Sequence, residues 1–243
     1  MTDLQTREDS GVLIITFARE AKKNAITVAM YQDLTQTLQR AASDPEIAVV
    51  LFHGSEQAFS AGNDLADFLS QPPDGLDAPV WQFLRTLAAF PKPLVAAVCG
   101  VAVGVGTTLL LHCDLVHAGS NARFSLPFVN LGLCPEAGSS LLLPRLFGYQ
   151  RAAEALLLGE PFDAEAAARA GLVSKVLEPH EVLESALAQA RKMASKPLQA
   201  LIETKRLLKS GDVVERIDEE ARVFARMLQA SAAQEAIAGF RNK

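Results

Sequence analysis

Three short apolar runs, each followed by a stretch with helical spacing, constrain the fold of this chain more than any other feature. The runs are 11–17 (GVLIITF), 47–53 (IAVVLFH) and 93–99 (PLVAAVC). Short apolar runs rich in β-branched residues are typical of strands buried inside a parallel or mixed sheet. Helices are expected from an N-cap at Thr27 to about Ala42, over 79–90, and beyond Gly104 to about His112, with a further short strand over 115–118. The repeated strand-then-helix order predicts an α/β architecture.

The character of the chain changes after residue 178. From 179 to 243 the sequence is rich in Ala, Lys, Glu and Arg with helical spacing, broken at Pro197 and near Gly211. We therefore expect a core over 1–178 and a C-terminal helical region over 179–243, read as a bundle of three or four helices. Apolar faces on such helices favour docking on another subunit.

Charge and cysteine content exclude several classes of protein. The net charge of −5 and the absence of long Lys/Arg runs argue against a nucleic-acid binder. The three cysteines, Cys99, Cys113 and Cys134, form no C-x-x-C pair, which favours buried thiols in a reducing compartment over a disulfide framework. The histidines lack ligand-like spacing, so no metal site is expected.

Neither the N-terminus nor the longest uncharged stretch is read as a membrane or export signal. The first ten residues are acidic and have no apolar core. Residues 94–111 carry no charge, but they contain three glycines and follow two prolines, so a buried strand, a turn and a helix are expected there. We therefore expect a cytoplasmic protein with no membrane association.

Two loops rich in small residues follow predicted strands, at 58–65 (AFSAGNDL) and 99–107 (CGVAVGVGT). Small residues expose backbone N–H groups, and the start of the following helix adds positive partial charge. Facing one another, such loops would form an oxyanion hole, which stabilises an enolate-like oxygen. Tight strand-to-helix packing is the alternative interpretation. Neither loop matches a dinucleotide or phosphate-loop fingerprint.

Taken together, these segments resemble the crotonase (enoyl-CoA hydratase/isomerase) family. The matching segments are 19–26 (REAKKNAI), 58–65, 100–109 with the following Cys-Asp-Leu at 113–115, 167–175 (AARAGLVSK) and the Lys-Pro-Leu at 196–198. They lie in the family's order and cover nearly the whole chain. The resemblance implies a spiral of ββα units with a C-terminal helical trimerisation region, and assembly as a homotrimer or a dimer of trimers.

The resemblance also implies site residues. The backbone N–H groups of Asn63 and Val105 would form the oxyanion hole, with Val105 standing where the family commonly has glycine. Residues expected to bind CoA are Lys22, Lys23, Ala61 and Asp64. For the two lysines, a solvated surface pair is the alternative.

The type of reaction is indicated by which glutamates the sequence has at the family's catalytic positions. The two glutamates of the family's hydratases are replaced here by Thr108 and Phe128. Residues 127–140 (PFVNLGLCPEAGSS) instead resemble the P-F-x-x-L-G-x-x-P-E-x-x-S-S segment of peroxisomal-type 3,2-enoyl-CoA isomerases, in which the glutamate is the single catalytic base. That residue is Glu136 here. The alternative interpretation is that Glu136 caps the helix expected over 141–146.

We therefore expect an isomerase that converts a 3-enoyl-CoA to a 2-enoyl-CoA, with the CoA thioester as substrate and no cofactor, and with apolar surroundings raising the pKa of Glu136. Two alternatives stay open. One is another crotonase-type reaction on an acyl-CoA, such as hydration, dehalogenation or C–C bond chemistry, for which Trp81 and His53 are the loose candidate partners. The other is a non-catalytic CoA-binding scaffold.

Overall fold

Two sheets organise the chain in the computed structural model, which describes residues 3–73, 75–209 and 211–241. The strands are β1 (Leu4–Asp9), β2 (Val12–Phe17), β3 (Val49–His53), β4 (Ala58–Ser60), β5 (Leu94–Val98), β6 (Val101–Val103), β7 (Leu115–Gly119), β8 (Arg123–Ser125), β9 (Phe162–Asp163) and β10 (Lys175–Leu177). The six-stranded sheet has the order β1-β2-β3-β5-β7-β10, and the four-stranded sheet has the order β4-β6-β8-β9. The pairs β1–β2 and β8–β9 are antiparallel, and all other neighbours are parallel.

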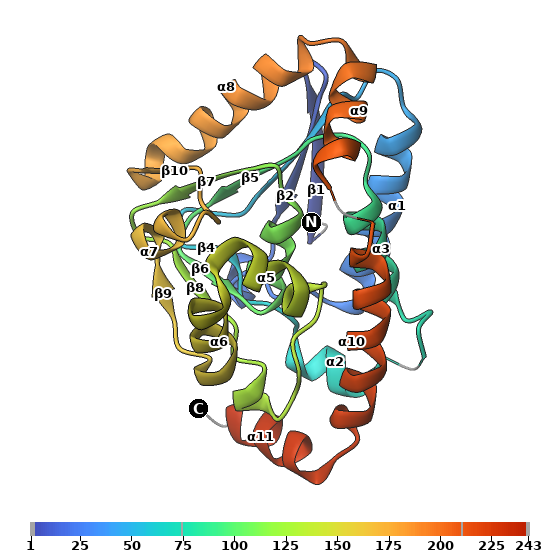
Figure 1. Cartoon of the computed structure of the whole chain (residues 1–243), viewed down its shortest axis with the longest axis vertical. Coiled ribbons are helices and arrows are strands. Elements are labelled where there is room, and N and C mark those ends of the chain that lie inside the picture. The colour runs from blue at the N-terminus through green and yellow to red at the C-terminus, as the bar shows by residue number, and fades with distance from the viewer. Residues whose placement is uncertain (1–2, 74, 210, 242–243) are drawn as a thin grey trace.

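Helices connect and cover these strands (Figure 1). The α-helices are α1 (Val28–Ser43), α2 (Leu65–Ser70), α3 (Pro79–Ala89), α4 (Val105–Thr108), α5 (Ser139–Phe147), α6 (Tyr149–Leu158), α7 (Ala164–Arg169), α8 (Val182–Ala194), α9 (Leu198–Leu208), α10 (Val213–Leu228) and α11 (Ser231–Arg241). Short 3-10 helices are η1 (Glu20–Lys22), η2 (Leu109–His112), η3 (Val129–Leu131) and η4 (Pro179–Glu181). The predicted α/β architecture is confirmed.

Local sequence explains several of these elements. Thr27 is the N-cap of α1, as predicted, and its side chain accepts a hydrogen bond of 3.2 Å from the amide of Met30. The three apolar runs form β2, β3 and β5. The helix expected beyond Gly104 is α4, and it continues as the 3-10 helix η2. The uncharged stretch 94–111 thus consists of four short elements, and none of the helices in the described residues is long and apolar enough to cross a membrane.

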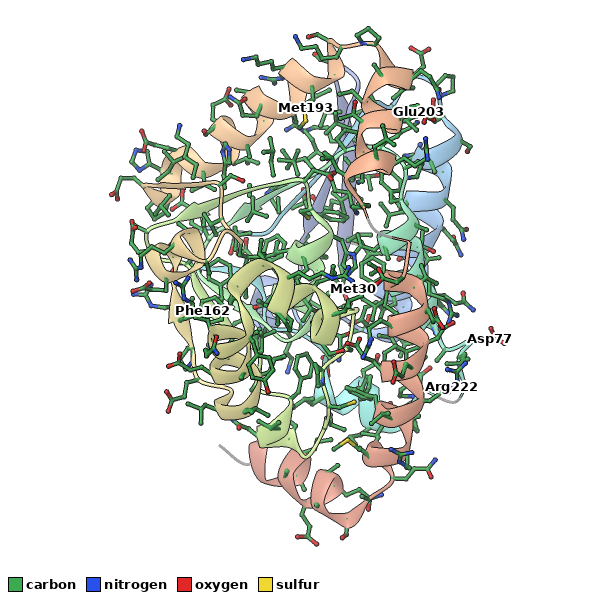
Figure 2. All side chains as sticks on the ribbon, in the orientation of Figure 1. Met30, Asp77, Phe162, Met193, Glu203 and Arg222 are labelled. Carbon is green, nitrogen blue, oxygen red and sulfur yellow. The ribbon has the colours of Figure 1, made fainter. Side chains whose placement is uncertain are left out.

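The six-stranded sheet separates two cores because successive side chains of a strand point to opposite faces. On β2, Leu13 and Ile15 pack into the larger core, whereas Val12 and Ile14 pack under α8. The larger core contains α1 and α3, and Met30 of α1, labelled near the middle of Figure 2, is one of its buried side chains. Both faces of the central strands are therefore buried, as their continuous apolar pattern predicts.

The helices beyond residue 178 pack mainly on earlier parts of the chain. In Figure 1, α8 crosses the upper edge of the molecule, where it contacts β3, β5 and β7. Helix α10 packs on α3 and α5, and α11 packs on η3. Four α-helices occur in the described residues from 179 to 241, within the predicted number, but they do not form the separate bundle that the sequence pattern suggested. The boundary between 178 and 179 stays a prediction.

Candidate active site

The two small-residue loops meet at one edge of the four-stranded sheet. Strands β4 and β6 are parallel neighbours, so the loops that follow them leave the sheet at the same end. The loops pack closely: a Cβ added to Gly62 would lie 2.7 Å from the carbonyl oxygen of Val103. A Cβ on Gly106 would lie 2.6 Å from the carbonyl oxygen of Ser60. Glycine is therefore required at both positions for the loops to approach each other.

Two backbone amides are left unpaired where these loops meet. Within the described part of the chain, neither the N–H of Asn63 nor that of Val105 donates to a protein acceptor. Val105 is the first residue of α4 and is only 1% exposed. Because buried backbone N–H groups are nearly always hydrogen-bonded, an unpaired one suggests that its acceptor comes from a ligand. The amides of Asn63 and Val105 are therefore candidate donors to a ligand oxygen.

A cavity of about 790 Å³ opens beside these amides. It is lined by Ala21, Lys22, Lys23, Ala25, Ala61, Gly62, Asn63, Asp64, Leu65, Ala66, Phe68, Val103, Gly104, Val105, Pro127, Phe128, Leu131, Leu133, Phe224 and Ile237. This lining brings together six of the seven site residues predicted from the sequence. The seventh, Glu136, is not part of the lining; it stands three positions after Leu133, which is. The mixture of apolar walls with a few polar groups is typical of a small-molecule site.

Glu136 is a buried carboxyl group with one oxygen free of protein contacts. Its side chain is 2% exposed, and Thr108 Oγ1 donates a hydrogen bond of 2.6 Å to Oε1. Among the described residues, nothing hydrogen-bonds to Oε2. Burial raises the pKa of Glu136 to about 8, the Thr108 hydrogen bond lowers it, and the nearby carboxylate of Glu220 raises it. The predicted upward shift is therefore confirmed, with burial as its main cause.

The alternative interpretation of Glu136 as a helix cap is wrong. The N-cap position of α5 is Gly138, and no side chain of the helix's own N-terminal segment caps it. The carboxylate that contacts the start of α5 belongs instead to Glu220 of α10, which accepts from the amides of Gly138 at 2.6 Å and Ser140 at 2.9 Å. The side chain of Glu136 is thus not required for capping.

Two further residues support the site, and sequence reasoning missed both. Tyr31 of α1 donates a hydrogen bond of 2.5 Å to Asn63 Oδ1, which fixes the side chain of the loop residue whose amide is unpaired. Burial raises the pKa of Tyr31 well above its ordinary value, so it remains a neutral donor. Glu220 is the second. Neither Tyr31 nor Glu220 belongs to a sequence motif. Each is recognised only from its hydrogen bonds, Tyr31 to Asn63 and Glu220 to the start of α5.

The residues expected to bind CoA lie around the mouth of the cavity. Lys22 and Lys23 are exposed at its rim. The side chain of Asp64 is already occupied: it pairs with Arg19 at 2.7 Å and caps α2 by accepting from the amides of Ala66 and Asp67. The amide of Ala61 donates to the carbonyl of Lys23 at 2.8 Å, which joins the lysine segment to the first loop.

The loose candidates for other crotonase-type chemistry are placed elsewhere. Trp81 is buried and packs edge-to-face on Phe224, with ring centroids 5.4 Å apart. His53 accepts from the hydroxyl of Thr16 at 2.7 Å and donates from Nδ1 to the carbonyl of Gly54 at 2.9 Å. Neither side chain lines the cavity beside Asn63 and Val105.

The sequence and the structure were compared with those of known proteins, and both comparisons identify a family. The family model described as enoyl-CoA hydratase/isomerase matches residues 7–243. The chain is 36% identical to 2,3-dehydroadipyl-CoA hydratase of Escherichia coli (strain K12), covering 100% of this chain and 97% of that protein. It is 41% identical to enoyl-CoA delta isomerase 2 of Rattus norvegicus, over 73% of this chain and 46% of that longer protein. The solved structure of Pseudomonas aeruginosa OdaA superimposes with a TM-score of 0.97 at 45% identity, and the match covers 100% of both chains. The chain therefore belongs to the enoyl-CoA hydratase/isomerase family of crotonase-type acyl-CoA enzymes.

Proposed function

We propose that this enzyme moves the double bond of a 3-enoyl-CoA into conjugation, giving the 2-enoyl-CoA, with Glu136 as its single base. The observation that carries the proposal is the environment of Glu136. Its side chain is buried, its Oε1 accepts from the hydroxyl of Thr108, and its Oε2 has no hydrogen-bond partner among the described residues. A carboxylate with one unpaired oxygen can accept a proton and return it. A raised pKa makes it a stronger base once it is ionised.

Hydration is the competing reaction because the similar Escherichia coli protein is a hydratase. Activating a water needs two groups that hold it. The positions that carry glutamate in the family's hydratases hold Thr108, which is committed to Glu136, and Phe128, whose apolar side chain lines the cavity. Glu220 is a second buried carboxylate close by, but its two oxygens accept from the amides of Gly138 and Ser140. This arrangement favours proton transfer over addition of water.

The unpaired amides supply the second part of the proposed mechanism. The thioester carbonyl of the substrate would accept hydrogen bonds from the N–H groups of Asn63 and Val105, and its oxygen becomes negative when a C2 proton leaves. The partial positive charge at the start of α4 favours the same oxygen. Preorganised donors of this kind stabilise a developing oxyanion by about 3 kcal/mol each.

In the proposed mechanism one residue, Glu136, both removes and returns the proton. Glu136 Oε2 takes a proton from C2 of the 3-enoyl thioester, and the electron pair delocalises over a dienolate. The same carboxyl group then returns the proton to C4, and the double bond lies between C2 and C3. The reaction written this way consumes no water, metal ion or redox cofactor.

The CoA portion of the substrate is proposed to lie at the rim of the cavity. Lys22 and Lys23 would face its phosphates. Ala61 and Asp64 would contribute through the loop that they build, because the Asp64 carboxylate already pairs with Arg19. Assembly as a homotrimer or a dimer of trimers is a further part of this proposal, supported by Leu207 and Leu208 of α9, which are 75% and 81% exposed. Sedimentation velocity tests the assembly.

The proposed reaction is tested by incubating trans-3-hexenoyl-CoA with the wild type and with Glu136→Gln. Formation of the 2-enoyl thioester by the wild type alone supports the isomerase and its base together. A 3-hydroxyacyl product from trans-2-hexenoyl-CoA would instead identify a hydratase. Binding without turnover of either substrate would favour a different acyl-CoA reaction or a scaffold. Equal turnover by both proteins would assign the base to another residue.

A further inference from the structure

The backbone that follows Glu136 has an uncommon conformation. Ala137 and Gly138 are consecutive residues with positive φ, at 63° and 69°. A residue with a Cβ is disfavoured in this left-handed region, and it persists there only when its surroundings hold it. Ala137 is fully buried. The direction in which Glu136 points is therefore set by whatever holds this turn.

Two side chains from distant parts of the chain hold the turn. His112 donates from Nε2 to the carbonyl of Ala137 at 2.8 Å. Burial lowers the pKa of His112 to about 3, so it is a neutral donor. From the other side, Glu220 accepts from the amide of Gly138, 82 residues away in the sequence, and from that of Ser140.

Glu220 supplies what the start of α5 lacks. A helix leaves its first amides without partners inside the helix, and a nearby carboxylate is favoured there. Gly138 has no side chain that could cap the helix, and the carboxylate of Glu220 takes that place from α10. Figure 1 shows α10 running alongside the segment that carries α5. Glu220 is only 5% exposed, so water does not provide an equivalent partner.

We propose that Glu220 is a positioning residue for Glu136: its carboxylate, reaching from α10, caps α5 and fixes the Ala137–Gly138 turn, and with it the position of the proposed base. This proposal rests on the role of Glu136 as the base. It also makes helix α10 part of the catalytic apparatus, because removal of the Glu220 carboxylate takes away one of the two distant side chains that hydrogen-bond to this turn among the described residues, the other being His112.

The charge of Glu220 reaches Glu136 as well. Several titratable and charged groups lie on the elements packed around Glu220. The loop before α5 carries Cys134 and Glu136, and α10 itself carries Glu215, Arg216, Asp218, Glu219, Arg222 and Arg226. Arg85 on α3 pairs with Asp218, Arg145 on α5 pairs with Asp212, and Glu235 on α11 is exposed. Burial raises the pKa of Cys134 to about 11, so this thiol is neutral. Burial raises the pKa of Glu220, while its hydrogen bonds from Ser140 and Gly138 and the charge of Arg216 lower it. Where Glu220 is ionised, its charge raises the pKa of Glu136.

The test compares Glu220→Gln and Glu220→Ala with the wild type and with Asp218→Asn. The control replaces an acid on the same helix and breaks its 2.8 Å ion pair with Arg85, so it disturbs the docking of α10 without touching the turn. Two rates are followed with trans-3-hexenoyl-CoA: exchange of the C2 protons with deuterated solvent, and formation of the 2-enoyl product. Circular dichroism establishes which variants are folded.

Glu220→Ala is expected to lower both rate constants by about 100-fold with little change in KM, because a misplacement of about 1 Å costs that much. Glu220→Gln keeps the size of the side chain but loses the charge and one acceptor. Its rate constants should fall less, and the acid limb of its kcat/KM profile should move to lower pH. Asp218→Asn should change neither kcat nor the acid limb.

A purely structural role predicts a different result, namely lower stability with an unchanged kcat and pH profile in the folded variants. That result in Glu220→Gln, which preserves the size of the side chain, would overturn the proposal even where Glu220→Ala does not fold. If the wild type exchanges the C2 protons but forms no 2-enoyl product, the isomerase proposal is overturned. The role of Glu220 can still be tested in that case, because the variants are compared by their rates of C2 exchange. A wild type that catalyses neither process would overturn both.

Discussion

Replacing Glu136 with glutamine should stabilise the folded protein at alkaline pH while removing its proposed base. Burial raises the pKa of Glu136 from 4.5 to about 8 in the folded protein. The protonated carboxyl group is therefore favoured by folding. The stability that it contributes is fully present below about pH 4.5 and is lost as the pH rises through about 8. A shift of this size corresponds to about 5 kcal/mol.

Glutamine isolates this contribution because it does not ionise and retains an oxygen that accepts from Thr108. The difference in unfolding free energy between variant and wild type should grow in the variant's favour by about 4 kcal/mol from pH 5 to pH 9. Urea denaturation followed by circular dichroism at several pH values measures it. Any cost of burying the amide is independent of pH and cancels in this comparison. Glu165→Gln, on the exposed surface of α7, is the matched control.

Parallel stability curves for the wild type and Glu136→Gln would refute this reasoning. They would mean that Glu136 ionises at a similar pH in the folded and unfolded chains. Burial would then not tune the base, and the rise in activity with pH described next would have to originate from another group.

Four further expectations follow from the site. Wild-type kcat/KM should rise about tenfold per pH unit up to pH 7 and level off above pH 8, because Glu136 must be ionised; a flat profile would contradict this. Val105→Pro removes the proposed donor at the first position of α4, where helices tolerate proline, and should lower kcat about 100-fold or more relative to Val105→Ala; similar rates would remove Val105 from the oxyanion hole. Phe68→Ala should join the cavities of about 790 and 350 Å³, both of which Phe68 lines, and should improve kcat/KM for long acyl chains relative to hexenoyl-CoA; an unchanged chain-length preference would show that they stay separate. Replacing Lys22 and Lys23 with alanine should raise KM several-fold for the CoA thioester and leave it unchanged for the pantetheine thioester, which lacks the nucleotide phosphates; equal effects on both would contradict a phosphate contact.

The sequence predicted those parts of the fold that are set by local pattern. Continuous β-branched runs identified the central strands, and a threonine N-cap identified the start of α1. The second sheet was missed because strands such as β4 and β6 have only three residues each, which is too short to show a period. The six residues around the cavity came from the resemblance to a family, since their spacing alone would also fit tight packing of loops.

The contacts that set the properties of Glu136 could not be predicted. Thr108 and Glu220 lie 28 and 84 positions from Glu136 in the chain, and nothing local links them to it. Glu220 follows Glu219 on an amphipathic helix, and the sequence alone does not distinguish the buried carboxylate from its exposed neighbour. Only the docking of α10 against α5 makes that distinction.

The hydrogen bond between Thr108 and Glu136 also constrains how such an enzyme could diverge. The family's hydratases carry a carboxylate at the position of Thr108, whose hydroxyl here donates to Glu136 at 2.6 Å. A glutamate introduced at 108 would bring two buried carboxyl groups into contact, and like charges so close together cannot both ionise. If Glu136 is retained when an acid appears at position 108, one of the two carboxyl groups is therefore held protonated, and a two-carboxylate hydratase of this kind would differ from the present site in its charge state as well as in its residues.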